Sequence, residues 1–188
     1  MSSISIAGDT SGSIILQAPA VSGSTTLTLP TTTGTLVTSN AMPTGSIIQV
    51  TQTVANAWAY NGTTSTYTEM STNLRASITP SSSSSKIIYS VSGGRISYNS
   101  APLNCRIEVR RSTNGGSTWT ALHRFAQDLR FDANNYGFII SAQFMDEPAT
   151  TSSCMYSLFA SIVSGTAGIE SGSSVEERTK IILMEVKG

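Results

Sequence analysis

Apolar and polar residues alternate with a period of two through most of the chain, which is the pattern of β-strands with one covered face. The clearest run spans residues 104–111. One of its faces carries Cys105, Ile107 and Val109, and the other carries Arg106, Glu108 and Arg110. A slip of one residue would bury three charges, so the register of this strand is well specified. We expect the charged face to meet solvent, with Arg110 beside Glu108.

Shorter alternating runs predict further strands, the first of them at residues 47–54. The others lie at 74–79, 86–92, 118–124, 137–145, 154–163 and 179–186. Turn-forming residues separate the strands at 61–62, 81–85, 114–116 and 164–174. The best helix candidate is a short segment at 126–131. This spacing predicts an all-β fold for residues 46–188, an antiparallel β-sandwich or jelly roll.

Residues 1–45 form a different segment, which we interpret as an extended, β-rich leader that attaches and oligomerises the protein. Its aliphatic runs are too short to make a stable sheet alone and suit narrow strands that wind round a shared axis. Pro43 and Gly45 mark a joint where the chain changes direction into the body. The predicted assembly seam consists of Ile14, Leu16, Leu27, Leu29 and Leu36.

Charge is scarce in this sequence and changes the picture of its surface. Charged residues make up 12% of the chain, and the first 68 residues carry one, Asp9. Ser, Thr and Gly replace the missing charge, so the chain is expected to be covered by a partner rather than by water alone. We predict that this partner is another copy of the chain. A homotrimer is the specific expectation, because three slender leaders can bundle about one axis while three sandwiches pack beside it.

The charge balance and hydropathy exclude two classes of partner. Eleven basic and eleven acidic residues balance without a Lys/Arg block, so no electrostatic footprint for nucleic acid is present. No apolar run approaches the length of about 20 residues that a membrane span needs, and no secretion signal begins the sequence. Synthesis and folding in a cytoplasm are therefore expected. In that compartment Cys105 and Cys154 are predicted to be free buried thiols, with a disulfide as the alternative.

The order of several short motifs in the leader resembles a segment that recurs in fibre and other virion proteins of tailed bacteriophages. The motifs are Ile14-Ile15-Leu16, Gln17-Ala18-Pro19, Leu27-Thr28-Leu29-Pro30 and Gly34-Thr35-Leu36-Val37. The body is similar, less specifically, to the carboxy-terminal domains that follow such leaders in marine and cyanobacterial phage proteins. The matching stretches are 74–80, 84–91 and 179–186. The resemblance implies a trimeric jelly roll of the complement and tumour-necrosis-factor type on the virion surface.

One hairpin motif resembles the aspartate box of sialidases, with Asn114 in the Asp position of residues 112–119. That box is a structural turn, in which the turn side chain bonds backbone and the Trp packs beneath. Glycosidase chemistry needs a separate pair of carboxylates, and none can be assigned here. We therefore predict a hairpin and no catalytic residue. Serines are abundant, but none lies in a Gly-x-Ser-x-Gly elbow.

Surface-binding loops are the remaining candidates for function, and their residues are Trp58, Tyr60, Asn61 and Asn114. Trp58 and Tyr60 can present aromatic faces to a sugar or pack across strands, and packing is the commoner role of aromatic residues beside a hairpin. Similarly, Arg110 and Arg111 can hold an anionic polysaccharide or belong to a plain polar surface.

No cofactor or metal site is predicted. His123 is the single histidine, and its distance in sequence from the two cysteines argues against a site with nitrogen and sulfur ligands. The acidic residues Asp128, Asp132, Asp146 and Glu147 lack the spacing of a known calcium loop and are expected to be solvated or ion-paired.

These observations lead to a non-enzymatic homotrimer on the virion surface, in contact with other virion proteins. The first interpretation is a short fibre or adhesin that contacts host-surface glycan. The alternative is a capsid decoration or head-fibre protein that reinforces the shell, and the absence of a sizeable anchor domain before the leader favours it. A glycan hydrolase is a third hypothesis, based on the hairpin motif alone.

Overall fold

The computed structural model describes residues 3–7, 9–17, 20, 31, 42–131, 138–171 and 178–188. The chain divides into two units, Met1–Leu36 and Val37–Gly188, which are described separately.

In the first unit β1 (Ser3–Ala7) and β2 (Ser13–Gln17) form an antiparallel hairpin. In this hairpin the backbone of Ile14 pairs with that of Ile6, and the backbone of Leu16 pairs with that of Ile4. The seam residues Leu27, Leu29 and Leu36 lie outside the described residues.

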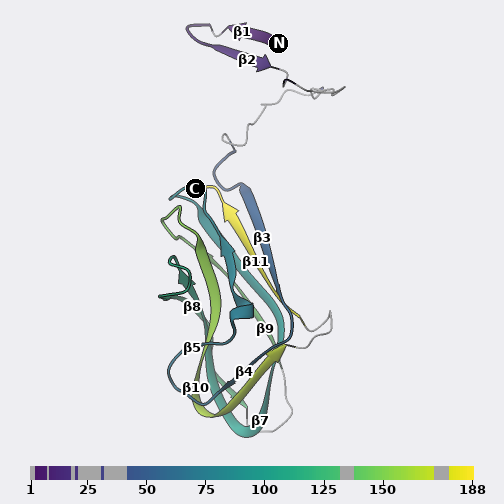
Figure 1. Cartoon of the computed structure of the whole chain (residues 1–188), viewed down its shortest axis with the longest axis vertical. Helices are drawn as coiled ribbons and strands as arrows, with labels where there is room; N and C mark the ends of the chain where they lie inside the picture. The colour runs from purple at the N-terminus through teal and green to yellow at the C-terminus, as the bar shows by residue number, and fades with distance from the viewer. Residues whose placement is uncertain are drawn as a thin grey trace. The chain divides into compact units, whose positions relative to one another are not determined.

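The second unit is built almost entirely of antiparallel strands, as the sequence predicts (Figure 1). Its elements are β3 (Ile47–Ala55), β4 (Trp58–Gly62), β5 (Thr68–Glu69), the 3-10 turn η2 (Thr72–Leu74), β6 (Ala76–Ile78), β7 (Lys86–Ser112), β8 (Thr120–Phe131), β9 (Phe138–Asp146), β10 (Cys154–Ser171) and β11 (Thr179–Val186). The all-β prediction is confirmed.

The long strand β7 joins two layers of this sandwich. Its first part, residues 86–96, pairs with β11 on one side and β9 on the other, and β3 extends this layer beyond β11. We call this layer the β3 sheet. The second part, residues 103–112, pairs with β8 and β10, and β10 also pairs with β4, β5 and β6. We call this layer the β8 sheet.

The core lies between these two layers and follows the predicted alternation. Cys105, Ile107 and Val109 of the β8 sheet are fully buried. Tyr89 of the β3 sheet meets Tyr156 of the β8 sheet, with ring centroids 5.9 Å apart. The indole Nε1 of Trp58 donates to Thr179 Oγ1 at 3.0 Å and so connects β4 with β11. The alternate residues of these strands point away from the core and form the two outer faces of the sandwich.

The best candidate for a short helix, residues 126–131, is a strand instead, because these residues continue β8 and pair with β7. The pairing contains register shifts near Cys105 and Ile107, and Asp128 has a positive φ of 53°. Such bulges add a residue to one strand, so the period of two is lost locally. The turns expected at 61–62 and 164–174 are also wrong over residues 61–62 and 164–171, which belong to β4 and β10.

Glu185 supplies a pH-dependent element of this fold. Its carboxylate is 1% exposed, and Oε1 accepts from both the backbone N and the Oγ of Ser81 at 2.6 Å. Burial alone raises the pKa of Glu185, but these hydrogen bonds outweigh it, and the net pKa lies below the usual value.

A carboxylate whose pKa is lower in the folded state stabilises the protein above its unfolded pKa of about 4.3. We therefore expect the urea midpoint to fall as the pH drops from about 5 through the folded pKa of Glu185, which lies below the unfolded value. In Glu185→Gln this part of the acid dependence should be lost, so its midpoint should change less over the same range. Denaturation curves at matched protein concentration measure both. Equal pH dependence in the two proteins would contradict this role of Glu185.

Candidate functional site

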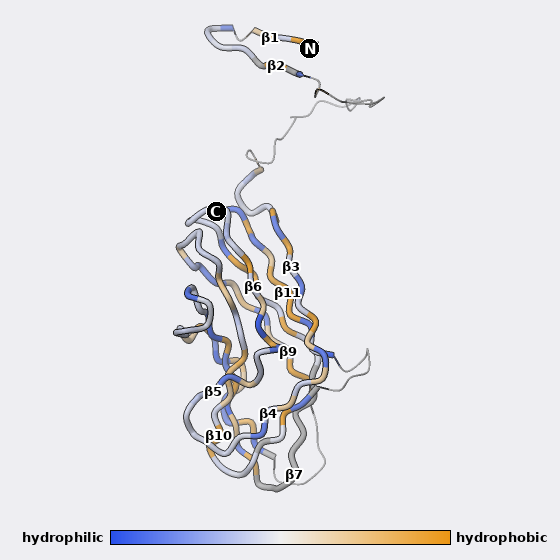
Figure 2. Tube along the Cα trace, in the orientation of Figure 1, coloured by the Kyte–Doolittle hydropathy of each residue, from blue (hydrophilic) through white to orange (hydrophobic). Residues whose placement is uncertain are grey.

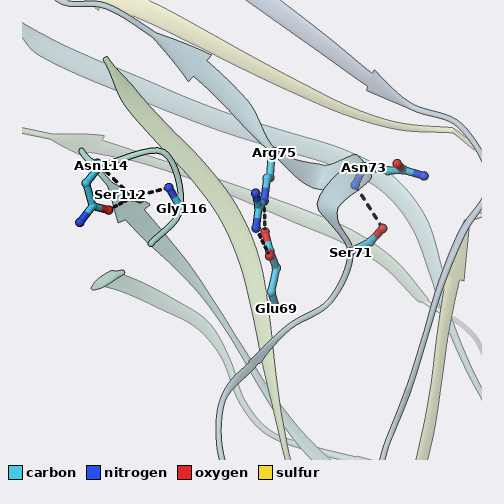
Figure 3. A network of polar contacts seen from close by, with 7 residues as sticks. All are labelled: Glu69, Ser71, Asn73, Arg75, Ser112, Asn114 and Gly116. Carbon is cyan, nitrogen blue, oxygen red and sulfur yellow. Dashed lines mark hydrogen bonds and ion pairs between the residues drawn. The ribbon is translucent and has the colours of Figure 1, made fainter. Parts of the chain in front are cut away.

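The hairpin between β7 and β8 is held together by the side chains of Ser112 and Asn114 (Figure 3). Asn114 Oδ1 accepts from Ser112 Oγ at 2.8 Å and from the backbone N of Thr118 at 3.0 Å, while its Nδ2 donates to Thr118 Oγ1 at 2.8 Å. Ser112 Oγ accepts from the backbone N of Gly116 at 2.9 Å. Asn114 thus bonds backbone in the turn, as the sequence predicts for this motif.

We expect Asn114→Ala to lower the free energy of unfolding by about 1–3 kcal/mol, because the backbone N of Thr118 and the hydroxyl of Ser112 lose their acceptor. Asn114→Asp is the matched control, since it retains the acceptor oxygen and should lose clearly less stability. Chemical denaturation of both variants at one protein concentration measures the difference. Equal losses would contradict a role of Oδ1 in holding the turn.

Trp119, the last residue of the motif, anchors the hairpin on the outer face of the β8 sheet. Its ring lies 5.1 Å from that of Phe159 on β10, and the guanidinium of Arg75 lies 5.5 Å from its centroid. Arg75 is in turn fixed by two hydrogen bonds to Glu69, at 2.8 and 2.7 Å (Figure 3). Phe159 and Arg75 thus engage the indole in packing, so Trp119 is a structural residue.

A band of arginine and aromatic side chains continues from this anchor across the β8 sheet. We call it the arginine band, and it consists of Tyr67, Glu69, Arg75, Glu108, Arg110, Trp119, Arg124 and Phe159. The guanidinium of Arg110 lies 4.8 Å from the ring centroid of Phe159 and 5.1 Å from that of Tyr67. Such cation–π contacts hold the guanidinium groups flat against the sheet.

Glu108 neutralises the centre of the arginine band. Its carboxylate lies 2.6 Å from Arg110 Nη2 and 3.6 Å from Arg124 Nη2, and the residue is 3% exposed. The expectation that Glu108 faces solvent in a plain polar surface is therefore wrong. Tyr67 and the arginine side chains cover this carboxylate, so one charge of the alternating strand is buried with its partners.

Ion pairing limits what the arginine band can bind. Arg75 pairs with Glu69, Arg110 and Arg124 pair with Glu108, and Arg106 beside them pairs with Asp128 at 3.1 Å. Burial raises the pKa of Tyr67, and the charge of Glu108 raises it further, so its phenol stays protonated. An anionic polysaccharide would have to displace these carboxylates, so the geometry favours a structural role for Arg110.

The aromatic residues of the predicted surface loops belong to the core. Trp58 is 4% exposed and Tyr60 is 8% exposed, and the Tyr60 hydroxyl lies 2.7 Å from Thr68 Oγ1. The structure therefore corresponds to the packing alternative and contradicts a sugar-stacking surface made of these two rings. Asn61 is exposed on β4, where its backbone pairs with Gly168. Asn61 and the Asn114 turn remain as the accessible members of the predicted set.

Both cysteines are free and buried, as predicted. Burial raises the pKa of the Cys105 thiol to about 11. The thiol is therefore protonated and inaccessible, which argues against a role as a nucleophile. His123 stacks on Phe144, with ring centroids 5.2 Å apart. None of the described His, Cys, Asp and Glu residues gather in threes as a metal site would require.

The acidic residues considered as calcium ligands are instead ion-paired where the structure describes them. Asp128 pairs with Arg106, Asp146 with Arg111 at 2.6 Å and Glu147 with Lys86 at 2.8 Å. Asp132 lies outside the described residues. Within the described part of the chain, no helix is long and apolar enough to cross a membrane.

Comparisons with known proteins place the chain in no family. No protein-family model matches it, and no curated protein matches it. The VP2 protein of infectious bursal disease virus, in its derived T=1 particles, is similar with a TM-score of 0.43 and 9% identity, over 73% of this chain and 36% of that chain. The structure of the Gt strain of the same virus is similar with a TM-score of 0.46 and 10% identity. The match covers 97% of this chain and 46% of that chain. This chain spans less than half of those chains, and scores this low carry no argument about function.

Proposed function

We propose that this chain is a non-enzymatic, homotrimeric structural protein on the surface of a tailed-phage virion, where it acts as a short fibre or adhesin. The observation that carries this proposal is the succession of a fibre-like, almost uncharged leader and an antiparallel β-sandwich. The leader, residues 1–45, attaches the protein to other virion proteins and helps to trimerise it. The sandwich projects from the particle and contacts the host surface.

The contacts of the aspartate-box-like hairpin support a non-enzymatic role. Both polar atoms of the Asn114 amide are engaged in the turn, and Trp119 is engaged by Phe159 and Arg75. Glu69 and Glu108, the two carboxylates of the arginine band, are each paired with arginine. Acid and nucleophile roles need free carboxyl groups that flank a sugar, and this hairpin provides none.

Host-surface glycan is the proposed ligand, and the exposed residues Asn61 on β4 and Asn114 in the turn between β7 and β8 mark the surface that would contact it. A single shallow contact of this kind is weak. Three copies on one rigid particle raise the overall affinity by about 10²–10⁴ when all engage together. Trimerisation would therefore raise the affinity of these weak contacts enough for adhesion.

Competition for adsorption tests the adhesin role. Host cells are incubated with the purified protein, and the rate of phage adsorption is then measured. We expect saturating protein to slow adsorption, and protein denatured before use to have no effect. Unchanged adsorption would contradict the adhesin role. If virions that lack the protein also lost heat resistance, capsid decoration would replace it as the function.

The leader gives a further prediction. Replacing Leu27 and Leu29 together by Asp should abolish incorporation into virions, because two charges would enter a dry seam. Immunoblots of purified particles measure incorporation, and Thr26→Asp with Thr28→Asp is the matched control from the opposite face of the run. Normal incorporation of the Leu27 and Leu29 variant would mean that the leader is only a tether.

A further inference from the structure

Strand register in the β3 sheet aligns an apolar row across four strands. Val50 on β3 lies opposite Met184 on β11, Met184 opposite Ile88 on β7, and Ile88 opposite Met145 on β9. Successive residues of a strand point to opposite faces, and the sequence neighbours Ile87 and Leu183 are buried in the core. The row therefore lies on the outer face of the sandwich.

This outer face is exposed although one of its rows is entirely apolar. Val50 is 59% exposed and Met145 is 52% exposed, and Val54 and Ile139 on the same two strands are exposed as well. Figure 2 shows apolar residues recurring along β3 and β11. Scattered apolar residues on a surface are ordinary, but a contiguous apolar area marks an interaction site.

The rest of the face carries few charges, and Lys86, two residues before Ile88 on β7, is paired with Glu147 at its edge. The next row consists of Gln52, Ile182, Ser90 and Gln143, and the row after it of Val54, Lys180, Ser92 and Ser141. Lys180 is the one charged side chain among these three described rows. The outer face of the β8 sheet differs sharply, because the arginine band covers it.

The near absence of charge determines which partner fits this face. A nucleic acid or an anionic membrane surface requires clustered basic residues, and a charged protein would leave its own charges unpaired. Other copies of the same face, gathered about a three-fold axis, match it in both hydropathy and charge. With strands about 4.8 Å apart and a rise of about 3.4 Å per residue, three rows cover about 400 Å². These three rows supply about half of the roughly 800 Å² that each partner contributes to a specific interface, so the contact extends beyond them on the same sandwich.

We infer that the outer face of the β3 sheet packs against other copies of this chain, with the row Val50, Met184, Ile88 and Met145 at the centre of the contact. The inference rests on the proposed homotrimer and assigns its interface. The arginine band then remains on the outside of the assembly. This arrangement explains why the apolar outer surface lies on one sheet and the charged outer surface on the other.

Two exposed positions of the row allow a direct test on the full chain. Light scattering of the wild-type protein should give three times the monomer mass of 19.7 kDa. Val50→Glu with Met145→Glu should reduce the mass to that of the monomer, with the far-UV circular dichroism spectrum retained. The matched control, Thr113→Glu with Thr151→Glu, adds the same charge at exposed sites away from the face and should remain a trimer.

The outcomes separate this inference from the proposed function. A folded Val50 and Met145 variant that stays trimeric would overturn the assigned interface and leave the trimer intact. A monomeric wild-type protein would overturn the trimer and the interface with it. Peroxide oxidation of Met145 adds a measurement that needs no variant. We expect several-fold slower oxidation in concentrated, trimeric protein than in diluted monomer, and equal rates would overturn the interface.

Discussion

Replacing Asp146 by Ala is expected to lower the free energy of unfolding by about 3–5 kcal/mol, because it leaves the largely buried guanidinium of Arg111 without its partner. Asp146 is 8% exposed, and its Oδ2 lies 2.6 Å from Arg111 Nη1. The same oxygen accepts a hydrogen bond from the hydroxyl of Tyr156 at 2.7 Å. Burial raises the pKa of Tyr156, and the negative charge of Asp146 raises it further. The phenol therefore stays protonated and remains a hydrogen-bond donor.

The neighbouring residue provides the control for this prediction. Glu147 forms an ion pair with Lys86 at the surface, where water screens the charges, so Glu147→Ala should leave the unfolding midpoint nearly unchanged. Guanidinium denaturation at matched protein concentration measures both variants, because the stability of an oligomer depends on concentration. Equal midpoints for Asp146→Ala and the wild-type protein would contradict a structural role for this buried network.

A comparable loss, about 2–5 kcal/mol, is expected for Gly93→Ala. Gly93 has a φ of +93°, which costs an L-residue about 1–2 kcal/mol. An added Cβ would also meet the backbone carbonyl oxygen of Arg178, which precedes β11. Because backbone must move to make room, overpacking adds about 1–3 kcal/mol.

Gly115→Ala separates these two contributions. Gly115 has a similar φ of +70°, but an added Cβ there has no heavy atom within 4 Å. Its loss should therefore be limited to the conformational cost of about 1–2 kcal/mol. Denaturation curves of the two variants give the difference directly. A Gly93→Ala variant no less stable than Gly115→Ala would contradict the close approach of β7 to residue 178.

Local alternation was sufficient to predict most of the strands. Cys105, Ile107 and Val109 are buried as their spacing indicates, and residues 179–186 form β11 within the predicted bounds. Prediction failed where pairing departs from regular geometry. At 126–131 the register shifts of β8 remove the period of two, and neither a shift nor the positive φ of Asp128 is encoded in a short sequence pattern.

The surroundings of Asn114 could be predicted only in part. The turn follows from a contiguous motif, whereas the partners of Trp119 come from β10 and from the segment before β6. Glu108 appeared exposed for the same reason. Alternation gives the face on which Glu108 lies, but the side chains that cover it, such as Tyr67, are remote in sequence.

The apolar row of the β3 sheet was likewise invisible to sequence patterns. Val50, Ile88, Met145 and Met184 belong to four separate strands, and only their register makes them neighbours. Alternation alone identifies one outward residue at a time. The outer surface of a sheet therefore becomes readable only after the order and register of its strands are known.

Immunogold labelling of intact virions tests the central claim most directly, because it locates the protein on the particle. Antibodies raised against residues 46–188 would be applied to phage that encode the chain. The account predicts gold on the tail, consistent with a short fibre or adhesin that contacts the host. Gold over the head would contradict the fibre and favour a decoration protein, and particles without gold would contradict a place on the virion surface.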